Sequence, residues 1–182
     1  MDLIETKLDS TPRYHGVIVD VRTDTVRLPD GREAAREVVT HPGGVAILPL
    51  ADDGQVLLVR QYRYCVGQDL LEVPAGKLEP GEDPRPAALR ELEEEVGVIS
   101  EKLDYLGFLY VSPGIATEKI HLFLATGLKP GQVHPDDDEF LNMERLPFGE
   151  LLDRVLAGEI TDAKTAALVM KTQLLREREG MK

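Results

Sequence analysis

One stretch, residues 76–98, constrains this chain more than any other, because it joins a glycine-containing loop to a helix with acids along one border. The stretch reads GKLEPGEDPRPAALRELEEEVGV. Asp83 can cap the helix, Pro84 suits its first position and Gly97 can end it. With about 3.6 residues per turn, the apolar side chains share a stripe and the acids gather at its border. We expect the stripe to contain Ala88, Leu89, Leu92 and Val96, and the border to contain Glu91, Glu94 and Glu95.

These acids repel one another unless a cation lies between them. Glu91 and Glu95 are one helical turn apart, and like charges at that spacing destabilise a helix by about 0.2–0.5 kcal/mol per pair. Oxygen ligands without a cluster of Cys or His suit Mg²⁺ or Mn²⁺, and Mg²⁺ usually completes its shell with water and substrate phosphate. An acidic run is most often an ordinary solvated helix face. The spacing of these acids nevertheless favours a metal site for diphosphate chemistry.

The same stretch resembles the signature of the Nudix hydrolases at every fixed position. That signature is Gly, five residues, Glu, seven residues, then Arg-Glu-apolar-any-Glu-Glu-any-Gly-apolar, and it is filled here by Gly76, Glu82, Arg90, Glu91, Leu92, Glu94, Glu95, Gly97 and Val98. The resemblance implies that Glu91 and Glu95 are the leading metal ligands, with Glu94 next. It also implies that Arg90 and Glu82 hold the helix and the loop in place for catalysis.

Composition limits the classes of function. The chain has 182 residues, a formal net charge of −12 and a single cysteine, Cys65. The negative charge repels a phosphate backbone, so we expect no nucleic-acid partner, and a diphosphate substrate needs local cations. One cysteine allows no intramolecular disulfide, and the sequence shows neither a signal peptide nor an apolar run long enough to span a bilayer. We therefore expect a cytoplasmic protein with no membrane partner.

Apolar alternation predicts strands on both sides of the helix. A short meander is expected in residues 16–22 and 26–28, and a hairpin in residues 43–50 and 55–64. Further strands are expected at 105–111, 119–126 and 140–146, with helices at 149–157 and 163–177. This order predicts an α/β (α+β) fold, a mixed β-sheet sandwich between helices, which is also the Nudix fold. Residues 1–40 are predicted to be an N-terminal antiparallel β meander used for dimerisation, and residues 41–182 the Nudix catalytic domain.

Motifs outside the signature resemble those of the ADP-ribose pyrophosphatase subfamily. They are Arg36-Glu37-Val38-Val39 before His41-Pro42-Gly43, Gln61-Tyr62-Arg63, Glu72-Val73-Pro74-Ala75-Gly76 and Ser112-Pro113-Gly114. The resemblance implies that the carbonyl of Ala75 is a metal ligand beside Glu91 and Glu95. It also implies a substrate site that contains Arg36, Glu37, Arg63, Glu72, Ser112, Pro113, Gly114 and Glu118.

The resemblance also implies a specific task for each of two acids. Glu118 is placed like the acid that meets the terminal ribose, and a carboxylate suits ribose hydroxyls because they are donors. In the subfamily, the loop equivalent to residues 135–139 folds over the site with a glutamate that positions or deprotonates the water. Glu139 aligns best with that base, while Asp137 and Glu94 stay open as alternatives.

The implied reaction is the hydrolysis of ADP-ribose to AMP and ribose 5-phosphate by a homodimer that needs Mg²⁺, for which Mn²⁺ can substitute. Another nucleoside diphosphate sugar, such as GDP-mannose, stays open as the substrate, because a pocket that reads ribose and diphosphate is tolerant. A sensor that binds ADP-ribose or a dinucleotide without cleaving it also stays open, although a sensor has no need of three acids together. A purely structural acidic domain would bind Mg²⁺ weakly and hydrolyse nothing.

Overall fold

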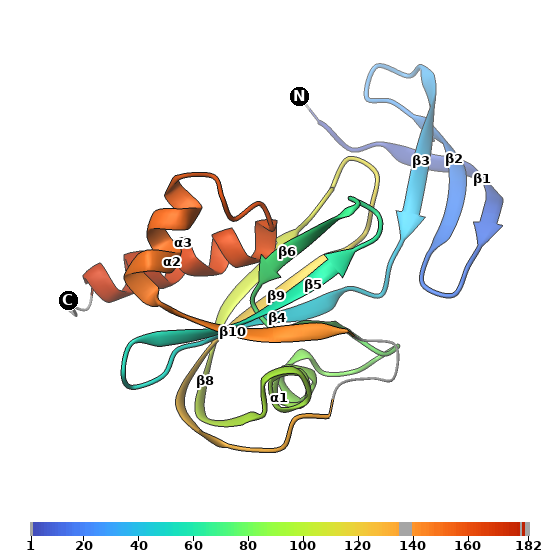
Figure 1. Ribbon diagram of the computed structural model, residues 1–182. Helices are drawn as coiled ribbons and strands as arrows, with labels where there is room; N and C mark the ends of the chain where they lie inside the picture. The colour runs from blue at the N-terminus through green and yellow to red at the C-terminus, as the bar shows by residue number, and fades with distance from the viewer. Residues whose placement is uncertain (1, 135–139, 179, 181–182) are drawn as a thin grey trace. The chain divides into compact units, whose positions relative to one another are not determined.

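The computed structural model describes residues 2–134, 140–178 and 180. They fold into two compact units (Figure 1): one holds the described residues up to 43 together with 110–119, and the other holds residues 44–109 together with the described residues from 120 onward. The strands are β1 (Thr6–His15), β2 (Asp20–Arg27), β3 (Glu33–Thr40), β4 (Gly44–Pro49), β5 (Gln55–Arg63), β6 (Gln68–Glu72), β7 (Ala75–Lys77), β8 (Val98–Tyr110), β9 (Lys119–Pro130) and β10 (Leu141–Pro147), and the helices are α1 (Pro84–Val96), α2 (Phe148–Leu156) and α3 (Ala163–Arg178).

The first unit is an antiparallel sheet in the order β1-β2-β3. The meander predicted at 16–22 is wrong in its details: Gly16 donates its N–H to the carbonyl of Val19 at 3.0 Å, so residues 16–19 turn the chain between β1 and β2. Val17 at this turn is fully exposed. No period-2 pattern predicts β1, because all of its residues are exposed and no face of it selects apolar side chains. Segment 110–119 joins this unit without any local sign in the sequence.

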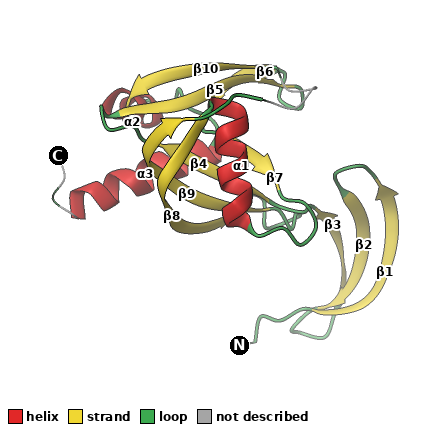
Figure 2. Cartoon of the chain, turned by 90° about the horizontal axis from the view of Figure 1, so that it is seen from below, coloured by secondary structure: helices red, strands yellow, loops and turns green. Residues whose placement is uncertain are grey.

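The second unit holds two sheets. One is mixed, in the order β7-β4-β9-β8, with β4 parallel to β9; the other is antiparallel, in the order β10-β5-β6. Along β4 the side chains alternate between two core clusters, so Val45 and Ile47 pack with α1 while Ala46 and Leu48 pack with α2 and α3. Helices therefore cover both faces of the sheet that contains β4: α1 lies on one face, and α2 and α3 lie on the other (Figures 1 and 2). The predicted α/β fold with sheets between helices is confirmed.

Helix α1 begins and ends at the predicted residues. The Asp83 carboxylate accepts from the Arg85 N–H at 2.9 Å, and Gly97 ends the helix with φ of 63°. Its buried face, however, is rotated from the prediction: Leu89 is 39% exposed, while Ala87 is fully buried. Because the face is rotated toward the acids, Glu91 and Glu95 lie within the buried stripe and not at its border.

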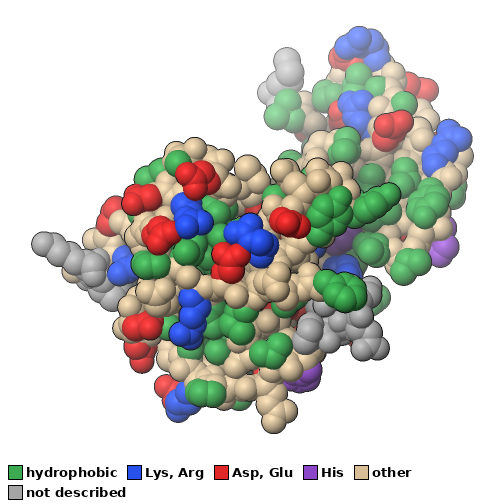
Figure 3. Space-filling view, in the orientation of Figure 1, with side chains coloured by type: hydrophobic (Ala, Val, Ile, Leu, Met, Phe, Trp, Pro, Cys, Tyr) green, Lys and Arg blue, Asp and Glu red, His purple; other side chains and the backbone are tan. Residues whose placement is uncertain are grey.

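Charged and apolar side chains are both exposed on the surface. Over α2 and α3 the visible face carries Asp and Glu interspersed with Lys and Arg (Figure 3), although the chain as a whole is acidic. In the first unit large apolar side chains are exposed, among them Leu3, Ile4, Tyr14 and Val17. Among the helices that the structure describes, none combines the length and apolarity that crossing a membrane requires.

Candidate active site

Two carboxylates of α1 meet the start of strand β7. Glu91 and Glu95 are 7% and 1% exposed. The backbone N–H of Ala75 donates to Oε2 of Glu95 at 3.1 Å. A Cβ built on Gly76 would lie 1.9 Å from Cδ and Oε1 of Glu91. Glycine at this position therefore leaves the space that the Glu91 carboxylate fills.

Arg90 joins the helix to the loop before it. Its Nη1 donates to Oε1 of Glu91 at 2.9 Å and to Oε2 of Glu94 at 2.8 Å, and its Nη2 lies 3.5 Å from Oε1 of Glu82. The other oxygen of Glu82 accepts from the N–H of Glu79 at 2.9 Å, which fixes the loop. Burial alone lowers the pKa of Arg90, but the charges of Glu91 and Glu94 outweigh burial and raise that pKa. The guanidinium is thus a permanent clamp between loop and helix.

The donors beside this clamp suit a hard divalent cation. Mg²⁺ is commonly held by one or two carboxylates, with water and substrate phosphate in the remaining positions. Glu91, Glu95 and the carbonyl of Ala75 could supply such a set. Glu94, the third predicted ligand, is only half-buried and pairs with Arg90. Within the part of the chain that the structure describes, no three His, Cys, Asp or Glu side chains converge as a ready metal cluster.

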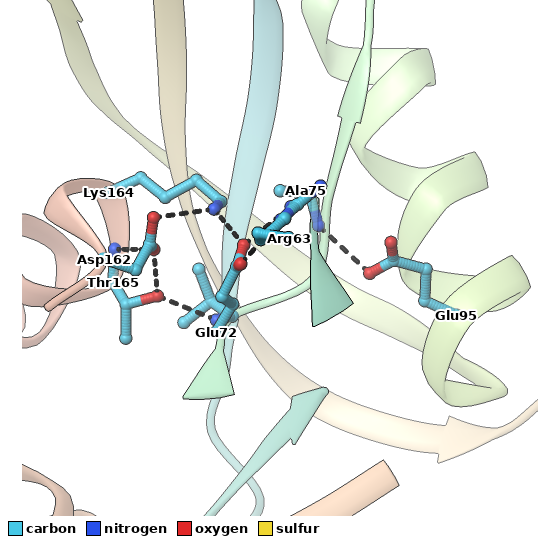
Figure 4. A network of polar contacts seen from close by, with 8 residues as sticks. Arg63, Glu72, Ala75, Glu95, Asp162, Lys164 and Thr165 are labelled. Atoms are coloured by element: carbon cyan, nitrogen blue, oxygen red, sulfur yellow. Dashed lines mark hydrogen bonds and ion pairs between the residues drawn. The ribbon is translucent and has the colours of Figure 1, made fainter. Parts of the chain in front are cut away.

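Arg63 and Glu72, both predicted to contact substrate, contact each other. Nε and Nη2 of Arg63 donate to Oε1 and Oε2 of Glu72, each at 2.7 Å (Figure 4). Burial alone would raise the pKa of Glu72, but the larger combined effect of Arg63 and Lys164 lowers it below its ordinary value. The carboxyl therefore stays ionised. Glu72 is fully buried, whereas the Arg63 side chain is 40% exposed. Arg63 is therefore the member of the pair that reaches the surface, and direct contact of Glu72 with a substrate stays a prediction.

The start of α3 completes this network with residues that no motif predicts. Lys164 donates to Oε2 of Glu72, and to Oδ1 of Asp162 at 2.9 Å. The Thr165 N–H donates to Oδ2 of Asp162 at 2.9 Å, and the Val73 N–H donates to Oγ1 of Thr165 at 2.9 Å. Asp162 is a recognisable N-cap ahead of a helical run. No local pattern, however, places Lys164 beside a glutamate 92 residues earlier.

The other predicted substrate residues lie in the first unit. Arg36 donates from Nε and Nη2 to the two carboxylate oxygens of Glu5 at 2.9 and 2.6 Å. The hydrogen bonds to Glu5 raise the pKa of Arg36. Glu37 is exposed on the same strand, and successive side chains of a strand point to opposite faces. The structure therefore places Arg36 and Glu37 on different faces of β3.

Segment 112–118 turns back onto the end of β3. The Ala116 N–H donates to the carbonyl of Ser112 at 2.8 Å, which closes the turn that contains Pro113 and Gly114. After this turn, Oε1 of Glu118 lies 3.9 Å from Nδ1 of His41. The structure thus places Glu118 beside the His41-Pro42-Gly43 motif. Arg36, by contrast, forms an ion pair with Glu5.

The predicted base lies outside the described residues, as do Asp137 and the rest of segment 135–139. The chain on its N-terminal side is fixed to the C-terminal end of α1. The Gly131 N–H donates to the carbonyl of Gly97 at 2.8 Å, and the His134 N–H donates to the carbonyl of Glu94 at 3.1 Å. Assignment of Glu139 as the base therefore stays a prediction.

A hollow of about 610 Å³ lies at the opposite, N-terminal end of α1. Asp83, Arg85, Tyr105 and His121 are among its lining residues, and none of the described residues predicted for the site is there. The acids sit later in the helix, on the face that meets Ala75 and Gly76. The candidate active site is therefore the surface around those acids and Arg63, not this hollow.

Comparisons with known proteins agree with the sequence motifs. Residues 40–168 match the family model described as NUDIX domain, and residues 5–39 match the nucleoside diphosphate sugar hydrolase N-terminal domain. The chain is 40% identical over 183 residues to the methanol dehydrogenase activator of Bacillus methanolicus, with 99% of this chain and 97% of that protein covered. It is 39% identical over 171 residues to the ADP-ribose pyrophosphatase of Bacillus subtilis (strain 168), with 93% and 92% covered.

A solved structure extends the likeness to three dimensions. The crystal structure of an ADP compounds hydrolase superposes with a TM-score of 0.88, at 23% identity and with 100% of both chains covered. At that identity the likeness concerns the fold.

Proposed function

This chain belongs to the Nudix family, and on that premise we propose that it hydrolyses ADP-ribose to AMP and ribose 5-phosphate with a bound divalent metal, Mg²⁺ or Mn²⁺. The family membership predicted from residues 76–98 is confirmed by the match over residues 40–168. The choice of substrate is supported by the Bacillus subtilis relative, which is named an ADP-ribose pyrophosphatase.

One structural observation carries the proposal: the buried carboxylates of Glu91 and Glu95 lie against Ala75 and Gly76 of β7. Two carboxylates buried one helical turn apart are costly to ionise unless cations or donors compensate them. Arg90 compensates Glu91 in part, and the Ala75 N–H does so for Glu95. A metal held by Glu91, Glu95 and the Ala75 carbonyl would neutralise diphosphate charge and lower the pKa of a water.

The other side chains have roles that follow from their charge and exposure. Arg63 carries the half-exposed positive charge beside the acids and would bind a diphosphate oxygen through charge-assisted hydrogen bonds. Glu118 would accept from a hydroxyl of the terminal ribose, with Ser112, Pro113 and Gly114 forming the adjacent turn. Glu139 would position or deprotonate the attacking water.

We further propose that the protein acts as a cytoplasmic homodimer. The ten residues of β1 are all exposed, and large apolar side chains stand on the surface of the same unit (Figure 3). A second subunit would cover this surface and bring Arg36 or Glu37 to its partner's site.

A substrate panel tests the reaction. The purified protein is incubated with ADP-ribose, GDP-mannose, NADH or diadenosine polyphosphates, with Mg²⁺ or with EDTA, and the products are separated by chromatography. ADP-ribose should give the highest kcat/KM, with AMP and ribose 5-phosphate as products and no turnover in EDTA. Preference for GDP-mannose would leave the family assignment standing and overturn the substrate. No hydrolysis of any of these compounds would overturn the enzymatic proposal.

The Bacillus methanolicus relative favours a second candidate function, because it spans 99% of this chain and is named as an activator of another enzyme. This chain could likewise act on a methanol dehydrogenase. Adding wild-type protein and Glu91→Gln separately to that enzyme distinguishes two routes. Activation by both would indicate a regulator that does not need the acids, whereas activation by wild type alone would indicate that activation depends on hydrolysis.

A further inference from the structure

We propose that Lys164, anchored by Asp162 at the start of α3, is a positioning residue that holds the Glu72–Arg63 pair so that Arg63 presents its guanidinium to the substrate diphosphate. The proposal rests on the proposed function in one respect, namely that Arg63 binds the diphosphate. Lys164 itself has no assigned contact with the substrate.

Four charged side chains form one continuous network from α3 to the site (Figure 4). Two are positive, Lys164 and Arg63, and two are negative, Asp162 and Glu72, so the network is neutral. Side-chain exposure rises from 1% at Glu72 and 14% at Lys164 to 40% at Arg63. The three less exposed side chains therefore surround one cation, Arg63, that reaches the surface.

Lys164 keeps the two acids from competing for that cation. It donates to both Glu72 and Asp162, and thus occupies the position between them. Without its charge, Arg63 would be the only cation of the network left to both acids, and the negative charge of Asp162 already acts on Arg63. A guanidinium drawn toward the buried Glu72 and the partly buried Asp162 would move away from the surface. Lys164 prevents this by donating to Oδ1 of Asp162, the oxygen that Thr165 does not bind.

The bidentate ion pair of Arg63 with Glu72 leaves N–H donors of the guanidinium for a substrate. Nε and Nη2 bind the carboxylate, while Nη1 has no hydrogen-bond partner among the residues that the structure describes. The charge of Glu95 also acts on Arg63, so Arg63 belongs to the electrostatic surroundings of the α1 acids. A planar guanidinium fixed on one edge is pre-organised to bind phosphate with the other.

The same turn of α3 also fixes the backbone beside the acids. Oγ1 of Thr165 accepts from the N–H of Val73, and two residues later the N–H of Ala75 donates to Glu95. The first turn of α3 thus anchors both the side chain of Arg63 and the chain segment that carries Ala75. This double anchorage explains how a helix outside the family signature can influence the site.

The kinetic test is a double-mutant cycle between Lys164→Met and Arg63→Met, with ADP-ribose as substrate and urea unfolding of each variant. Lys164→Met should lower kcat/KM by at least about tenfold, as when a group that orients a binding side chain is lost. In the Arg63→Met background the further loss should be below about twofold, because coupled residues do not add. Lys171→Met is the matched control: it lies on the same helix, bonded to the carbonyl of Leu106, and should keep wild-type kcat/KM.

A second measurement does not depend on turnover. The Nε–Hε signal of Arg63 in ¹H–¹⁵N spectra, assigned with Arg63→Lys, should exchange slowly with water in the wild type and rapidly in Lys164→Met. If Lys164→Met does not fold, Asp162→Asn replaces it, because asparagine keeps the helix cap while the anchor of Lys164 loses its charge.

The outcomes separate the two proposals. A wild-type protein that leaves ADP-ribose intact, but whose Arg63 signal loses protection on substitution, would refute the function and support the positioning role. An active wild type whose Lys164→Met variant keeps kcat/KM within about twofold, or retains a protected Arg63 signal, would overturn the positioning role. Fully additive losses in the cycle would overturn it as well.

Discussion

Gly76→Ala should nearly abolish turnover and leave the fold standing. The added Cβ would lie 1.9 Å from Cδ of Glu91, and Cβ atoms essentially never approach closer than 3.0 Å, so the carboxylate must withdraw by about 1.1 Å. A misplacement of about 1 Å in a site costs on the order of 100-fold in rate. Overpacking costs about 1–3 kcal/mol of folding free energy. Replacing a glycine by alanine stabilises the folded state by about 0.4–1 kcal/mol where the backbone permits alanine. Gly76 meets that condition, because its φ is not positive.

The assay compares kcat/KM for ADP-ribose at several Mg²⁺ concentrations with urea unfolding of the same samples. Gly149→Ala is the matched control, because a Cβ there meets nothing within 4 Å and φ is not positive. The control should keep full activity, whereas Gly76→Ala should lose about 100-fold and need more Mg²⁺. A Gly76→Ala variant within about twofold of the wild type would refute the link between Gly76, the Glu91 carboxylate and turnover.

Glu91→Gln and Glu95→Gln should each lose most turnover and keep the fold, since each removes a charged oxygen ligand; wild-type rates at saturating Mg²⁺ would contradict the metal assignment. The pKa of Glu72 is lowered in the folded chain, so its stabilisation is present above its ordinary value of about 4.5 and is lost as pH falls through the lowered value. Urea unfolding should therefore show a steeper acid loss of stability for wild type than for Glu72→Gln, and equal slopes would contradict this. Glu118→Ala should narrow the preference for ADP-ribose over GDP-mannose more than it slows the chemistry; an unchanged ranking would contradict the ribose contact. Light scattering should give a dimer for the full chain and a monomer for a chain that starts at His41; a fully active monomeric full chain would refute the proposed dimer.

Local signals explain why α1 was predictable. Backbone geometry within a few residues selects its N-cap, Asp83, and its C-cap, Gly97, so sequence alone locates both ends. Which face is buried depends instead on the sheet behind the helix. That contact selects Ala87 in place of Leu89 and turns Glu91 inward. The strand β1 shows the opposite case, because an exposed strand carries no alternation to detect.

The candidate site likewise contains contacts that a local motif can encode and contacts that only the tertiary fold creates. Within the signature, several fixed residues meet a partner in the same stretch: Gly76 leaves space for Glu91, and Arg90 bonds Glu91 and reaches Glu82. A short motif can encode those contacts because helix and loop geometry set the spacing. Beyond it, predicted substrate residues such as Glu72 turned out to have charged partners elsewhere in the chain.

Lys164 shows why such partners escape prediction from one sequence. A lysine in the first turn of a helix has many uses, and its spacing from Glu72 obeys no helical or strand period. What places it there is the packing of α3 against β4, which brings a second cation to the buried carboxylate that Arg63 already binds. A chain could therefore keep every residue of the signature and still lose its substrate if Lys164 were replaced. The reverse also follows: the network around Glu72 should persist in a variant that lacks the acids of α1, because none of its hydrogen bonds depends on them.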